Sequence, residues 1–437
     1  MRTFGAQPGA LPRLVVAAPA SGHGKTTIAT GLMAALSDAG HVVSGHKVGP
    51  DYIDPGYHSL ATGRPGRNLD PHLVGVENIA PLLAHGASGT DLSVIEGVMG
   101  LFDGKIGTDG FASTAHVARL TASPVLLVVD VSSASRTVAA MVQGLAAFDP
   151  SISVAGVILN KAGSQRHADE VRRSVESVGL PVLGVLQRDD GIVAPSRHLG
   201  LVPAAERDDA AATLRRLSER IAARVDLDRV VEIARSAPSL DVEPWDPRAH
   251  VARVSGTAPV VAVAGGRAFT FRYAETTELL EAAGCQVVPF DPLTDASLPA
   301  GTQGVYLGGG FPEVHAAGLS ANATLRAELR TAVLDGVPTV AECAGLLYLC
   351  RTVDDAPMVG ALEADAVMTP RLTLAYRQAT LTADGLLGGL GGTATGHEFH
   401  RTIVTPRAGA QAGWDLPDGP EGFTSATLHA SYLHTHW

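Results

Sequence analysis

Cysteine is nearly absent from this chain. Among its 437 residues only Cys285, Cys343 and Cys350 are cysteines, and no two of them form a Cys-x-x-Cys pair. A small, odd number without that spacing excludes a disulfide framework and gives no indication of a zinc site. The sequence therefore predicts a protein of a reducing compartment, the cytoplasm.

Long apolar runs and a basic charge balance are absent as well. No run approaches the roughly 18 apolar residues of a membrane span, and the N-terminal stretch MRTFGAQPGALPR lacks the apolar core of a signal peptide. The 33 basic and 44 acidic side chains give a formal net charge of −11, which argues against a nucleic-acid partner. We expect small-molecule partners, with neither nucleic acid nor a membrane among them.

Apolar runs that are present are short, and they alternate with amphipathic segments. Strands that alternate with helical segments indicate a parallel α/β sheet. In the first half of the chain the predicted buried strands are RLVVAAPA (13–20), HVVSGHKVG (41–49), DLSVIEG (91–97), PVLLVVDV (124–131), VAGVILNK (154–161) and PVLGVLQ (181–187).

The length predicts two or three domains of roughly 100–200 residues each. The stretch SAPSLDVEPWDPRAH (236–250) contains three prolines and is typical of a linker. A second α/β series begins after it, at PVVAVAGG (259–266). We therefore predict one domain over 1–245, a linker over 246–258 and a second domain over 259–437.

The stretch PASGHGKTT (19–27) follows a predicted strand and opens a predicted helix, which is the context of a phosphate-binding loop. Backbone N–H groups at a helix N-terminus bind phosphate oxygens. Lys25 would reach the outer phosphates of ATP, and the Thr26 hydroxyl would contact Mg²⁺. The spacing departs from GxxxxGK[ST], and a glycine-containing helix cap is the alternative. The predicted ATP-binding residues here are Ser21, Gly22, Gly24, Lys25, Thr26 and Thr27.

Three carboxylates follow strands near this loop. Glu96 ends a predicted buried strand and is a candidate Mg²⁺ ligand, with capping of the next turn as the alternative. Asp51 and Asp54 lie in KVGPDYIDPGYH (47–58), where two prolines and two glycines predict a loop and no helix. We expect Asp51 to face the metal, Asp54 to face the acceptor substrate, and Lys47 to neutralise the phosphates. If one of the two aspartates is a turn residue, Asp54 is the preferred choice.

Two further candidate residues lie in a loop and at a strand end. Asp103 lies within the glycine-punctuated stretch EGVMGLFDGKIGTDG (96–110), which is predicted to close over a substrate. Asn160 ends another strand, where its amide could bind adenine or simply form a turn.

The second half contains a strand–turn–helix elbow. Cys343 lies in VPTVAECAGLLYL (337–349), a pattern that predicts an exposed, strained thiol with a lowered pKa at a helix N-terminus. The N–H of Ala344 would face an oxyanion, and a glycine N–H of Gly308–Gly310 would be the second donor. A cysteine nucleophile needs a base, and the residues alone leave five candidates open: His397, His400, His429, His434 and His436.

These motifs together resemble the a,c-diamide synthases of corrin biosynthesis. The resemblance covers nearly the whole chain and depends on seven segments in the family's order: PASGHGKTT, KVGPDYIDPGYH, EGVMGLFDG, GGGFPE, ECAGLLYL, GHEFHRT and ASYLHTHW. It implies an N-terminal P-loop, dethiobiotin-synthetase-like ATPase and a C-terminal triad-type glutamine amidotransferase of flavodoxin-like α/β fold.

The resemblance also implies roles. Cys343 would be the nucleophile and His434 its base, and the amides of Ala344 and Gly309 would stabilise the oxyanion. The third triad member stays open, because Thr435 and His436 stand where the usual His-x-Glu would continue, and Glu342 is expected to point elsewhere.

ATP would convert a substrate carboxylate to an acyl phosphate, with Mg²⁺, and ammonia from glutamine would attack it. The acceptor would be a corrinoid polycarboxylate, which His58 and its neighbours Arg64, Arg67 and His72 could contact, with solvated surface charge as the alternative. Tyr52 and Tyr57 could pack on the flat ring, with a core role as the alternative. A homodimer is expected from the family.

Three rival interpretations remain at this point. Cobyric acid synthase and a nickel-sirohydrochlorin a,c-diamide synthase are related amidases, and a MinD-like regulatory ATPase belongs to a different class. KVGPDYIDPGYH and EGVMGLFDG favour a,c-diamidation. A cobalt-free ring is the favoured substrate, because the alanine-, glycine- and arginine-rich composition indicates a GC-rich, aerobic source.

Overall fold

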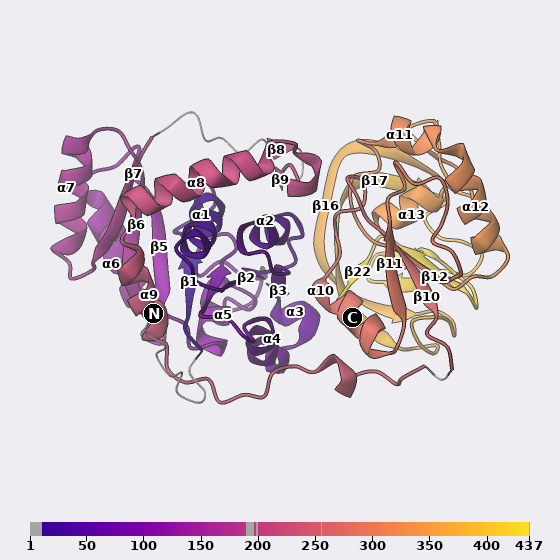
Figure 1. Ribbon diagram of the computed structural model, residues 1–437, viewed down its shortest axis with the longest axis horizontal. Helices are drawn as coiled ribbons and strands as arrows, with labels where there is room; N and C mark the ends of the chain where they lie inside the picture. The colour runs from indigo at the N-terminus through magenta and orange to yellow at the C-terminus, as the bar shows by residue number, and fades with distance from the viewer. Residues whose placement is uncertain (1–10, 189–195, 198–199, 255, 437) are drawn as a thin grey trace. The chain divides into compact units, whose positions relative to one another are not determined.

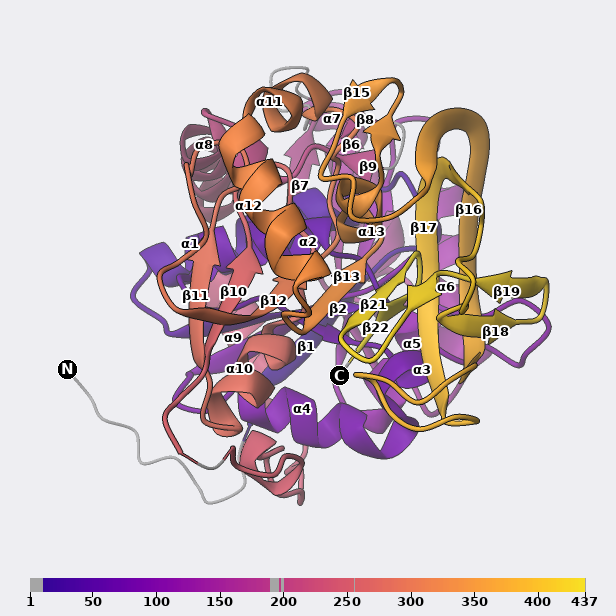
Figure 2. The same cartoon turned by 90° about the vertical axis from the view of Figure 1, so that its right-hand side faces the viewer.

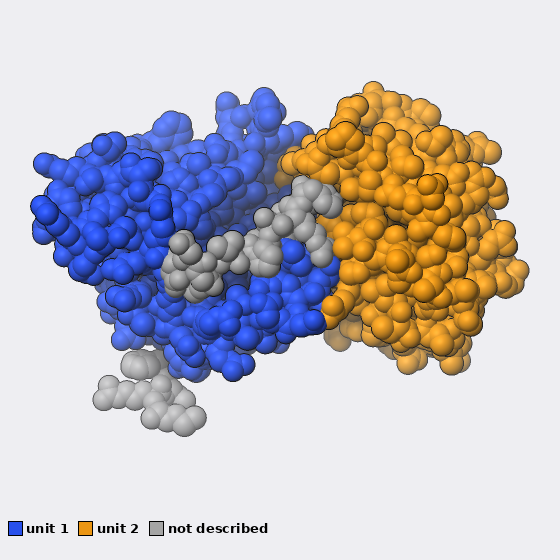
Figure 3. Space-filling view, turned by 90° about the horizontal axis from the view of Figure 1, so that it is seen from above, with its two compact units in different colours: residues 1–245 blue, residues 246–437 orange. Residues whose placement is uncertain are grey.

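The computed structural model describes residues 11–188, 196–197, 200–254 and 256–436. The chain folds into two compact units, residues 1–245 and 246–437, which Figure 3 shows in different colours. Each unit has its own hydrophobic core. In the described part of the chain, no helix combines the length and the apolar character that crossing a membrane requires.

The first unit is organised around a parallel sheet with strand order β3-β2-β4-β1-β5-β6-β7. The strands are short and largely buried, as expected for a sheet covered on both faces. Their bounds are β1 Arg13–Ala17, β2 Val43–Val48, β3 Arg67–Leu69, β4 Leu92–Glu96, β5 Val125–Asp130, β6 Val154–Ala162 and β7 Val182–Gln187, and a separate pair is formed by β8 Ser196–Arg197 and β9 Gly200–Leu201.

Helices cover both faces of this sheet. Because side chains alternate along a strand, Leu14 and Val16 pack with helices α1, α8 and α9, whereas Val15 and Ala17 pack with α4 to α7. Figure 1 shows α8 beside α1. The helices are α1 Lys25–Asp38, α2 Ile53–Thr62, α3 Pro71–Val74, α4 Ile79–Gly86, α5 Thr114–Leu120, α6 Thr137–Phe148, α7 Gln165–Glu176, α8 Ala210–Arg224 and α9 Leu227–Arg235, with 3₁₀ turns η1 Val76–Asn78 and η2 Ala204–Glu206.

Two features of this unit differ from the sequence expectation. All six predicted strands form, but β3 was not predicted because it has only three residues. The stretch 47–58 was predicted to be non-helical, and that is wrong for its second half, where α2 begins at Ile53. Pro55 lies in the first turn of α2, where the N–H that proline lacks would have no partner within the helix.

The second unit contains a five-strand parallel arrangement in the order β11-β10-β12-β13-β21, extended by the antiparallel β20. Taken in chain order this is the 2-1-3-4-5 arrangement of flavodoxin-like folds, as predicted. The strands are β10 Val260–Ala264, β11 Gln286–Phe290, β12 Thr302–Leu307, β13 Thr339–Glu342, β20 Phe423–Thr424 and β21 Leu428–Ser431, and the helices are α10 Ala274–Ala282, α11 Ala316–Ala321, α12 Ala323–Leu334 and α13 Ala344–Leu349, preceded by the 3₁₀ turn η3 Pro247–Ala249.

A second, mainly antiparallel sheet completes this unit and was not predicted. Figure 2 shows its two long strands, β16 and β17, side by side. The short β22, near the end of the chain, pairs with β17. The strands are β14 Thr352–Val353, β15 Ala356–Pro357, β16 Asp365–Leu381, β17 Thr393–Thr405, β18 Trp414–Leu416, β19 Gly419–Glu421 and β22 His434–Thr435.

Candidate active sites

The predicted phosphate loop connects β1 to α1. Gly22 and Gly24 have φ values of 86° and 88°, a left-handed conformation that glycine adopts without steric cost. Gly24 caps α1, so Lys25, Thr26 and Thr27 form its first turn, where the backbone N–H groups have no partner within the helix. Ser21 is exposed beside them. The loop thus has the geometry of an anion-binding helix N-terminus.

Residues from two neighbouring strands hold the loop. The amide nitrogen of Asn160 donates to the carbonyl of His23 at 3.0 Å, and its oxygen accepts the N–H of Lys161 at 3.0 Å. The Lys161 ammonium donates to the carbonyl of Gly22 at 3.0 Å and pairs with Asp130 at 2.7 Å. The structure therefore gives Asn160 a loop-holding contact, and adenine binding by its amide remains a prediction.

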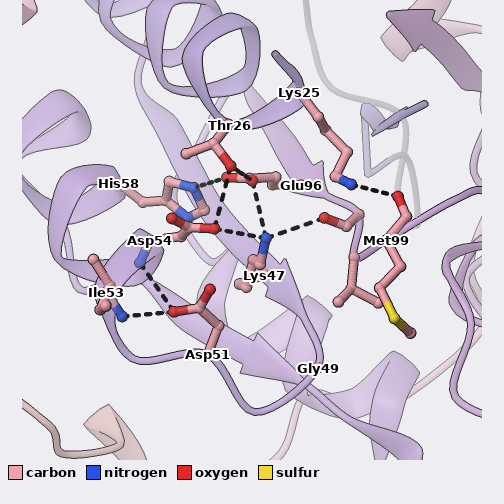
Figure 4. Close-up of polar contacts among 12 residues, drawn as sticks. Lys25, Thr26, Lys47, Gly49, Asp51, Ile53, Asp54, His58, Glu96 and Met99 are labelled. Carbon is pink, nitrogen blue, oxygen red and sulfur yellow. Dashed lines mark hydrogen bonds and ion pairs between the residues drawn. The ribbon is translucent and has the colours of Figure 1, made fainter. Parts of the chain in front are cut away.

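A buried cluster of charged side chains lies beside the loop, and Figure 4 shows it. The Thr26 hydroxyl donates to Glu96 Oε1 at 2.5 Å. Lys47 Nζ lies between two carboxylates, 2.9 Å from Glu96 Oε1 and 2.7 Å from Asp54 Oδ2. His58 Nε2 lies 2.8 Å from Glu96 Oε2. Three elements, α1, α2 and β4, thus direct oxygen atoms to one point, with Lys47 contributed by β2.

The electrostatics of this cluster favour a further cation. Burial acts to raise the pKa of Glu96, but the Lys47 ammonium and His58 outweigh it and hold that pKa well below its usual range. Burial acts to lower the pKa of Lys47, but Asp54 and Glu96 raise it. Burial and repulsion from Asp51 and Glu96 raise the pKa of Asp54. The Lys47 ammonium thus does not fully offset the cost of ionising Asp54 here, and a further cation beside Asp54 would favour its ionised form.

The donor set fits Mg²⁺, which is usually bound by one or two carboxylates, a hydroxyl and phosphate oxygens. The Thr26 hydroxyl oxygen lies 2.5 Å from Glu96 Oε1 and 3.4 Å from Asp54 Oδ2, so the three residues provide such oxygens. Among the described residues, no group of three or more His, Cys, Asp or Glu side chains could hold a metal ion by itself. A metal here would therefore need ligands from the nucleotide.

Lys25 points away from this cluster. Its Nζ donates to the carbonyl of Met99 at 2.6 Å. Burial, followed by repulsion from Lys47, lowers its pKa to about 8. An incoming phosphate would offset both effects, because it supplies the negative charge that the site lacks around this ammonium.

The structure reverses the expected roles of the two loop aspartates. Asp51 is the turn residue, because its Oδ1 accepts the N–H of Ile53 at 2.7 Å and that of Asp54 at 3.4 Å. Asp54 is buried and faces Lys47 and Thr26, so its side chain points to the phosphate loop and not outward to an acceptor. The choice of Asp54 as the turn residue was wrong, since the first turn of α2 rotates it inward.

His58 and Arg67 were expected near the substrate carboxylates, and burial excludes this for the side chains as the structure has them. His58 is fully buried behind Glu96, and Arg67 is 6% exposed within β3. Arg64 donates to the carbonyl of Ser88 at 2.8 Å, and His72 is half-buried in α3.

Of the expected ring-packing residues, Tyr57 is buried, and its hydroxyl donates to the carbonyl of Val202 at 2.6 Å. Tyr52 is half-buried at the N-cap of α2. Asp103 is exposed, and its Oδ2 accepts the N–H of Gly100 at 3.0 Å. Tyr52 and Asp103 thus stay accessible.

The elbow of the second unit connects β13 to α13. Cys343 caps the helix with φ 49° and ψ −97°, a strained conformation for a residue with a side chain. Its N–H donates to the carbonyl of Ser431 at 2.8 Å, and the N–H of Gly345 donates to the carbonyl of Gly308 at 3.0 Å. The turn is therefore held from both sides.

The backbone of Cys343 is strained as predicted, but its thiol is neither exposed nor acidic. Cys343 is 3% exposed. Burial and the nearby Glu313 raise its pKa, and the N–H of Ala344, which faces the sulfur, only partly opposes this rise. The expectation of a lowered pKa was wrong because desolvation outweighs the helix N-terminus. The resting residue is a neutral thiol.

The glycine loop after β12 brings the elbow and the predicted base together. A Cβ added at Gly309 would lie 2.4 Å from Cε1 of His434, so the imidazole packs directly on this glycine. Gly308 is bonded to the elbow through Gly345. The N–H of Gly309 is already donated to the carbonyl of Phe271 at 3.0 Å, which makes it unavailable as the expected second oxyanion donor.

His434 is one of several buried histidines, and its surroundings keep it neutral. Its ring stacks on that of His397 with centroids 5.0 Å apart. Burial, His397 and His400 lower the pKa of His434 well below its usual value, although Glu398 acts to raise it. A neutral imidazole can accept a proton from a neutral thiol.

The other two C-terminal histidines pack elsewhere. His429 packs edge-on against Trp414, and burial lowers its pKa to about 4. His436 lies 3.4 Å from Glu275. Of the remaining cysteines, Cys350 is fully buried, as expected of a structural residue, and Cys285 is half-buried.

Sequence reasoning missed two acidic residues near the thiol. Glu342 was expected to point elsewhere, yet its carboxylate binds Thr435, the residue after His434. Glu398 lies in β17, a strand that was not predicted, and it pairs with Arg377. The acid in GHEFH was the available signal for Glu398, whereas the contact of Glu342 joins two sheets and has no local signature.

Two family models match this chain, one in each unit. A CobQ/CobB/MinD/ParA nucleotide binding domain matches residues 14–202, and a CobB/CobQ-like glutamine amidotransferase domain matches residues 260–437. The parallel sheet with its phosphate loop and the cysteine elbow lie within these two regions. The protein is thus a glutamine-dependent amidating ligase with an ATP-binding unit.

Relatives identify the family more narrowly. The chain is 62% identical to the hydrogenobyrinate a,c-diamide synthase of Thermobifida fusca, covering 98% of this chain and 94% of that one. It is 53% identical to the hydrogenobyrinate a,c-diamide synthase of Streptomyces coelicolor, covering 98% and 95%. It is 42% identical to the cobyrinate a,c-diamide synthase of a Synechococcus species, covering 97% and 95%. The chain belongs to the a,c-diamide synthase family.

Proposed function

We propose that this protein amidates the a and c side-chain carboxylates of hydrogenobyrinic acid, using ATP and ammonia released from glutamine. The single observation that carries this proposal is the similarity over nearly the full chain to enzymes named hydrogenobyrinate a,c-diamide synthase. Three relatives named for the cobalt-containing cobyrinate are less similar, at 40–44% identity, which supports a cobalt-free ring as the preferred substrate. A MinD-like regulatory role would leave the buried cysteine elbow and its histidine without a use.

In the second unit, Cys343 attacks the side-chain amide carbon of glutamine. His434 takes the thiol proton as the sulfur–carbon bond forms, because both groups are neutral at rest, and then gives this proton to the leaving ammonia. The N–H of Ala344 is directed at the sulfur and can donate to the developing oxyanion. Water then hydrolyses the thioester to glutamate.

In the first unit, the phosphate loop binds ATP through the N–H groups at the start of α1 and through Lys25. A substrate carboxylate attacks the γ-phosphorus, ADP leaves, and an acyl phosphate forms. Neutral ammonia displaces phosphate from this acyl carbon to give the amide. Both parts run twice, once for each carboxylate.

Thr26, Asp54 and Glu96 would hold Mg²⁺, which would supply charge neutralisation on the phosphates when bound. Asp51 remains a candidate for an outer position, since its Oδ1 is used in the turn of α2. Tyr52 and Asp103 are the accessible candidates for contact with the corrinoid. Lys47, buried between the two carboxylates, orients these acids, and its ammonium favours the ionised form of Glu96.

We also propose a cytoplasmic location, where ATP and glutamine are available, and a homodimer, which light scattering of the purified protein would test.

The function is tested by incubating the protein with hydrogenobyrinic or cobyrinic acid, ATP, Mg²⁺ and glutamine, and counting amides by mass spectrometry. Two amides on the cobalt-free acid are expected, with a smaller kcat/KM for the cobalt form. Amides on the remaining side chains of a diamide substrate would instead indicate a cobyric acid synthase.

A further inference from the structure

Glu342 stands directly before the nucleophile, and its carboxylate is inside the protein. It ends β13 and is 4% exposed. Its Oε1 accepts the backbone N–H of Thr435 at 3.1 Å and the Thr435 hydroxyl at 2.8 Å. Its Oε2 accepts the hydroxyl of Tyr306 at 2.7 Å. Each carboxylate oxygen thus accepts a hydrogen bond, and Thr435 donates two of these bonds.

This carboxylate connects two different sheets. Tyr306 and Glu342 lie on the adjacent parallel strands β12 and β13. Thr435 lies on β22, which belongs to the antiparallel sheet and pairs with β17. The nucleophile therefore follows a strand of one sheet, while His434 is carried by the other. The bonds of Glu342 to Thr435 join these sheets one residue away from each catalytic candidate.

The strand that carries His434 needs such a contact. β22 has only two residues, which is shorter than an ordinary strand and leaves it few ladder bonds of its own. Its ladder to β17 consists of the pairs Gly396–Thr435 and His397–His434. A buried carboxylate that accepts two hydrogen bonds from Thr435 fixes the backbone position and rotation of this short strand on the side that faces β13.

The Tyr306 hydroxyl, which donates to Oε2 of Glu342, stays protonated. Burial and the neighbouring Glu342 carboxylate raise the pKa of Tyr306 well above its usual range. Its hydroxyl therefore remains protonated and holds Oε2, which leaves Oε1 directed at Thr435. Tyr306 orients the carboxylate, and the carboxylate orients the strand.

We propose that Glu342 is the positioning residue of the glutaminase reaction: through Thr435 it sets His434 against Cys343. In this chain it performs the orienting task of a triad carboxylate, although it acts through the backbone next to the histidine and not through the imidazole. This inference rests on the proposed roles of Cys343 and His434. The role of Glu342 explains how His434 can be held in place although the usual His-x-Glu pattern is absent. His436 stands two residues after His434, at the position of that glutamate.

The test compares Glu342→Ala, Glu342→Gln and the matched control Tyr306→Phe in the full-length protein. We measure glutamine-driven and ammonia-driven amidation, kcat and KM for glutamine, and the thermal unfolding temperature. A base misplaced by about 1 Å can cost about 100-fold, so Glu342→Ala should lower kcat for glutamine about 100-fold with KM changed less than about threefold. Ammonia-driven amidation should stay at the wild-type level.

The conservative variants separate positioning from folding. A glutamine amide keeps its oxygen as an acceptor for Thr435, while its NH₂ group, which only donates, can bond to the hydroxyl oxygen of Tyr306, so Glu342→Gln should recover about tenfold of the lost kcat. Tyr306→Phe keeps both bonds to Thr435 and should lower kcat for glutamine less than about fivefold, even if it lowers the unfolding temperature as much as Glu342→Gln.

Three results would overturn the inference. These are a kcat of Glu342→Ala close to wild type, equal losses in kcat for Glu342→Gln and Tyr306→Phe, or a parallel loss of ammonia-driven turnover in a folded Glu342 variant. If Glu342→Ala does not fold, the Gln and Phe pair decides alone. Cys343→Ala is assayed beside them. If Cys343→Ala retains glutamine-driven turnover, the proposed function fails. If Cys343→Ala is inactive and Glu342→Ala is active, only the positioning role is refuted.

Discussion

In both units the candidate active-site residues lie where a parallel strand turns into a helix. The two turns differ in the residues that form them. In each, a parallel strand ends in a tight turn that opens a helix: β1 leads to α1, and β13 leads to α13. The first turn uses Gly22 and Gly24 at positive φ, which costs little. The second uses Cys343 itself at φ 49°, which costs on the order of 1–3 kcal/mol.

This difference decides what surrounds each turn. The phosphate loop is relaxed and half-open, which suits the proposed binding of a large anion that enters from solvent. The elbow must be held in its strained form, and every residue of α13 is buried, with Cys343 and Gly345 bonded to other strands. One unit thus presents a backbone to a ligand, whereas the other imposes a position on one sulfur atom.

The largest expected effect separates the two units completely. Cys343→Ala removes the nucleophile, and because the chemistry of the first unit does not use the thiol, only one nitrogen source should be lost. We expect glutamine-driven amidation to fall at least about 10³-fold, with ammonia-driven amidation unchanged, in assays of amide formation by mass. Cys285→Ala is the control and should leave both activities intact. Equal loss with both nitrogen sources would contradict the separation.

The second prediction concerns a variant that should lose amidation with both nitrogen sources. Lys25→Met removes the cation that faces the outer phosphates, so both glutamine-driven and ammonia-driven amidation should fall about 10²–10³-fold, with KM for ATP raised. The control, Lys161→Met, changes another lysine of the loop, which contacts a carbonyl and Asp130, and should cost no more than about tenfold. Retained ammonia-driven turnover in Lys25→Met would show that the loop is not the ATP site.

The third prediction concerns packing at the predicted base. Gly309→Ala places a methyl group where it would lie 2.4 Å from the His434 ring and 3.0 Å from Phe271 Cβ. The imidazole must move, so glutamine-driven kcat should fall about 10–100-fold, with ammonia-driven turnover unchanged. In the same strand region, an added Cβ at Gly304 makes only ordinary contacts, the nearest at 3.5 Å, and Gly304→Ala should keep wild-type kcat. Similar kinetics for the two alanine variants would refute a base at His434.

The same contrast explains what the sequence could predict. The first unit was largely predictable, because the glycines, Lys25 and Thr26 are consecutive and Glu96 ends an apolar run, so each signal is local. The roles of Asp51 and Asp54 were reversed, because Pro55 was taken to exclude a helix although it is tolerated in a first helical turn.

In the second unit, local patterns predicted an α/β series and the elbow, but they predicted neither β21 nor the state of the thiol. Its burial depends on β17, β21 and β22, which are far from it in sequence. The long hairpin of β16 and β17 was missed, although Leu372 and Leu374 alternate with Thr373. Both leucines are exposed, so this alternation does not mark a buried face. The contact of Glu342 with Thr435 spans 93 positions, and no spacing rule reaches that far.

The smallest expected effect concerns two buried glutamates, one in each unit. Glu96 has Lys47 beside it and a lowered pKa, whereas burial raises the pKa of Glu421 to about 7 from an ordinary 4.5. Glu421 accepts the N–H of Tyr432 at 2.9 Å and the Ser431 hydroxyl at 2.5 Å, and so supports the segment that leads to His434. Between about pH 4.5 and about pH 7 the folded protein therefore binds more protons at this site than the unfolded chain does.

Because the folded state binds the extra proton, the contribution of Glu421 to the free energy of unfolding is largest below about pH 4.5 and is lost as the pH rises to about 7. Glu421→Gln cannot ionise and keeps an acceptor, so its unfolding free energy should decline about 2 kcal/mol less than that of the wild type between about pH 5 and about pH 8. Urea unfolding followed by tryptophan fluorescence, to which Trp414 contributes from its position opposite Glu421 in β18 and β19, measures both proteins. An equal decline in the two would mean that Glu421 is ionised in the folded state without a partner cation, and that the contrast with Glu96 does not hold.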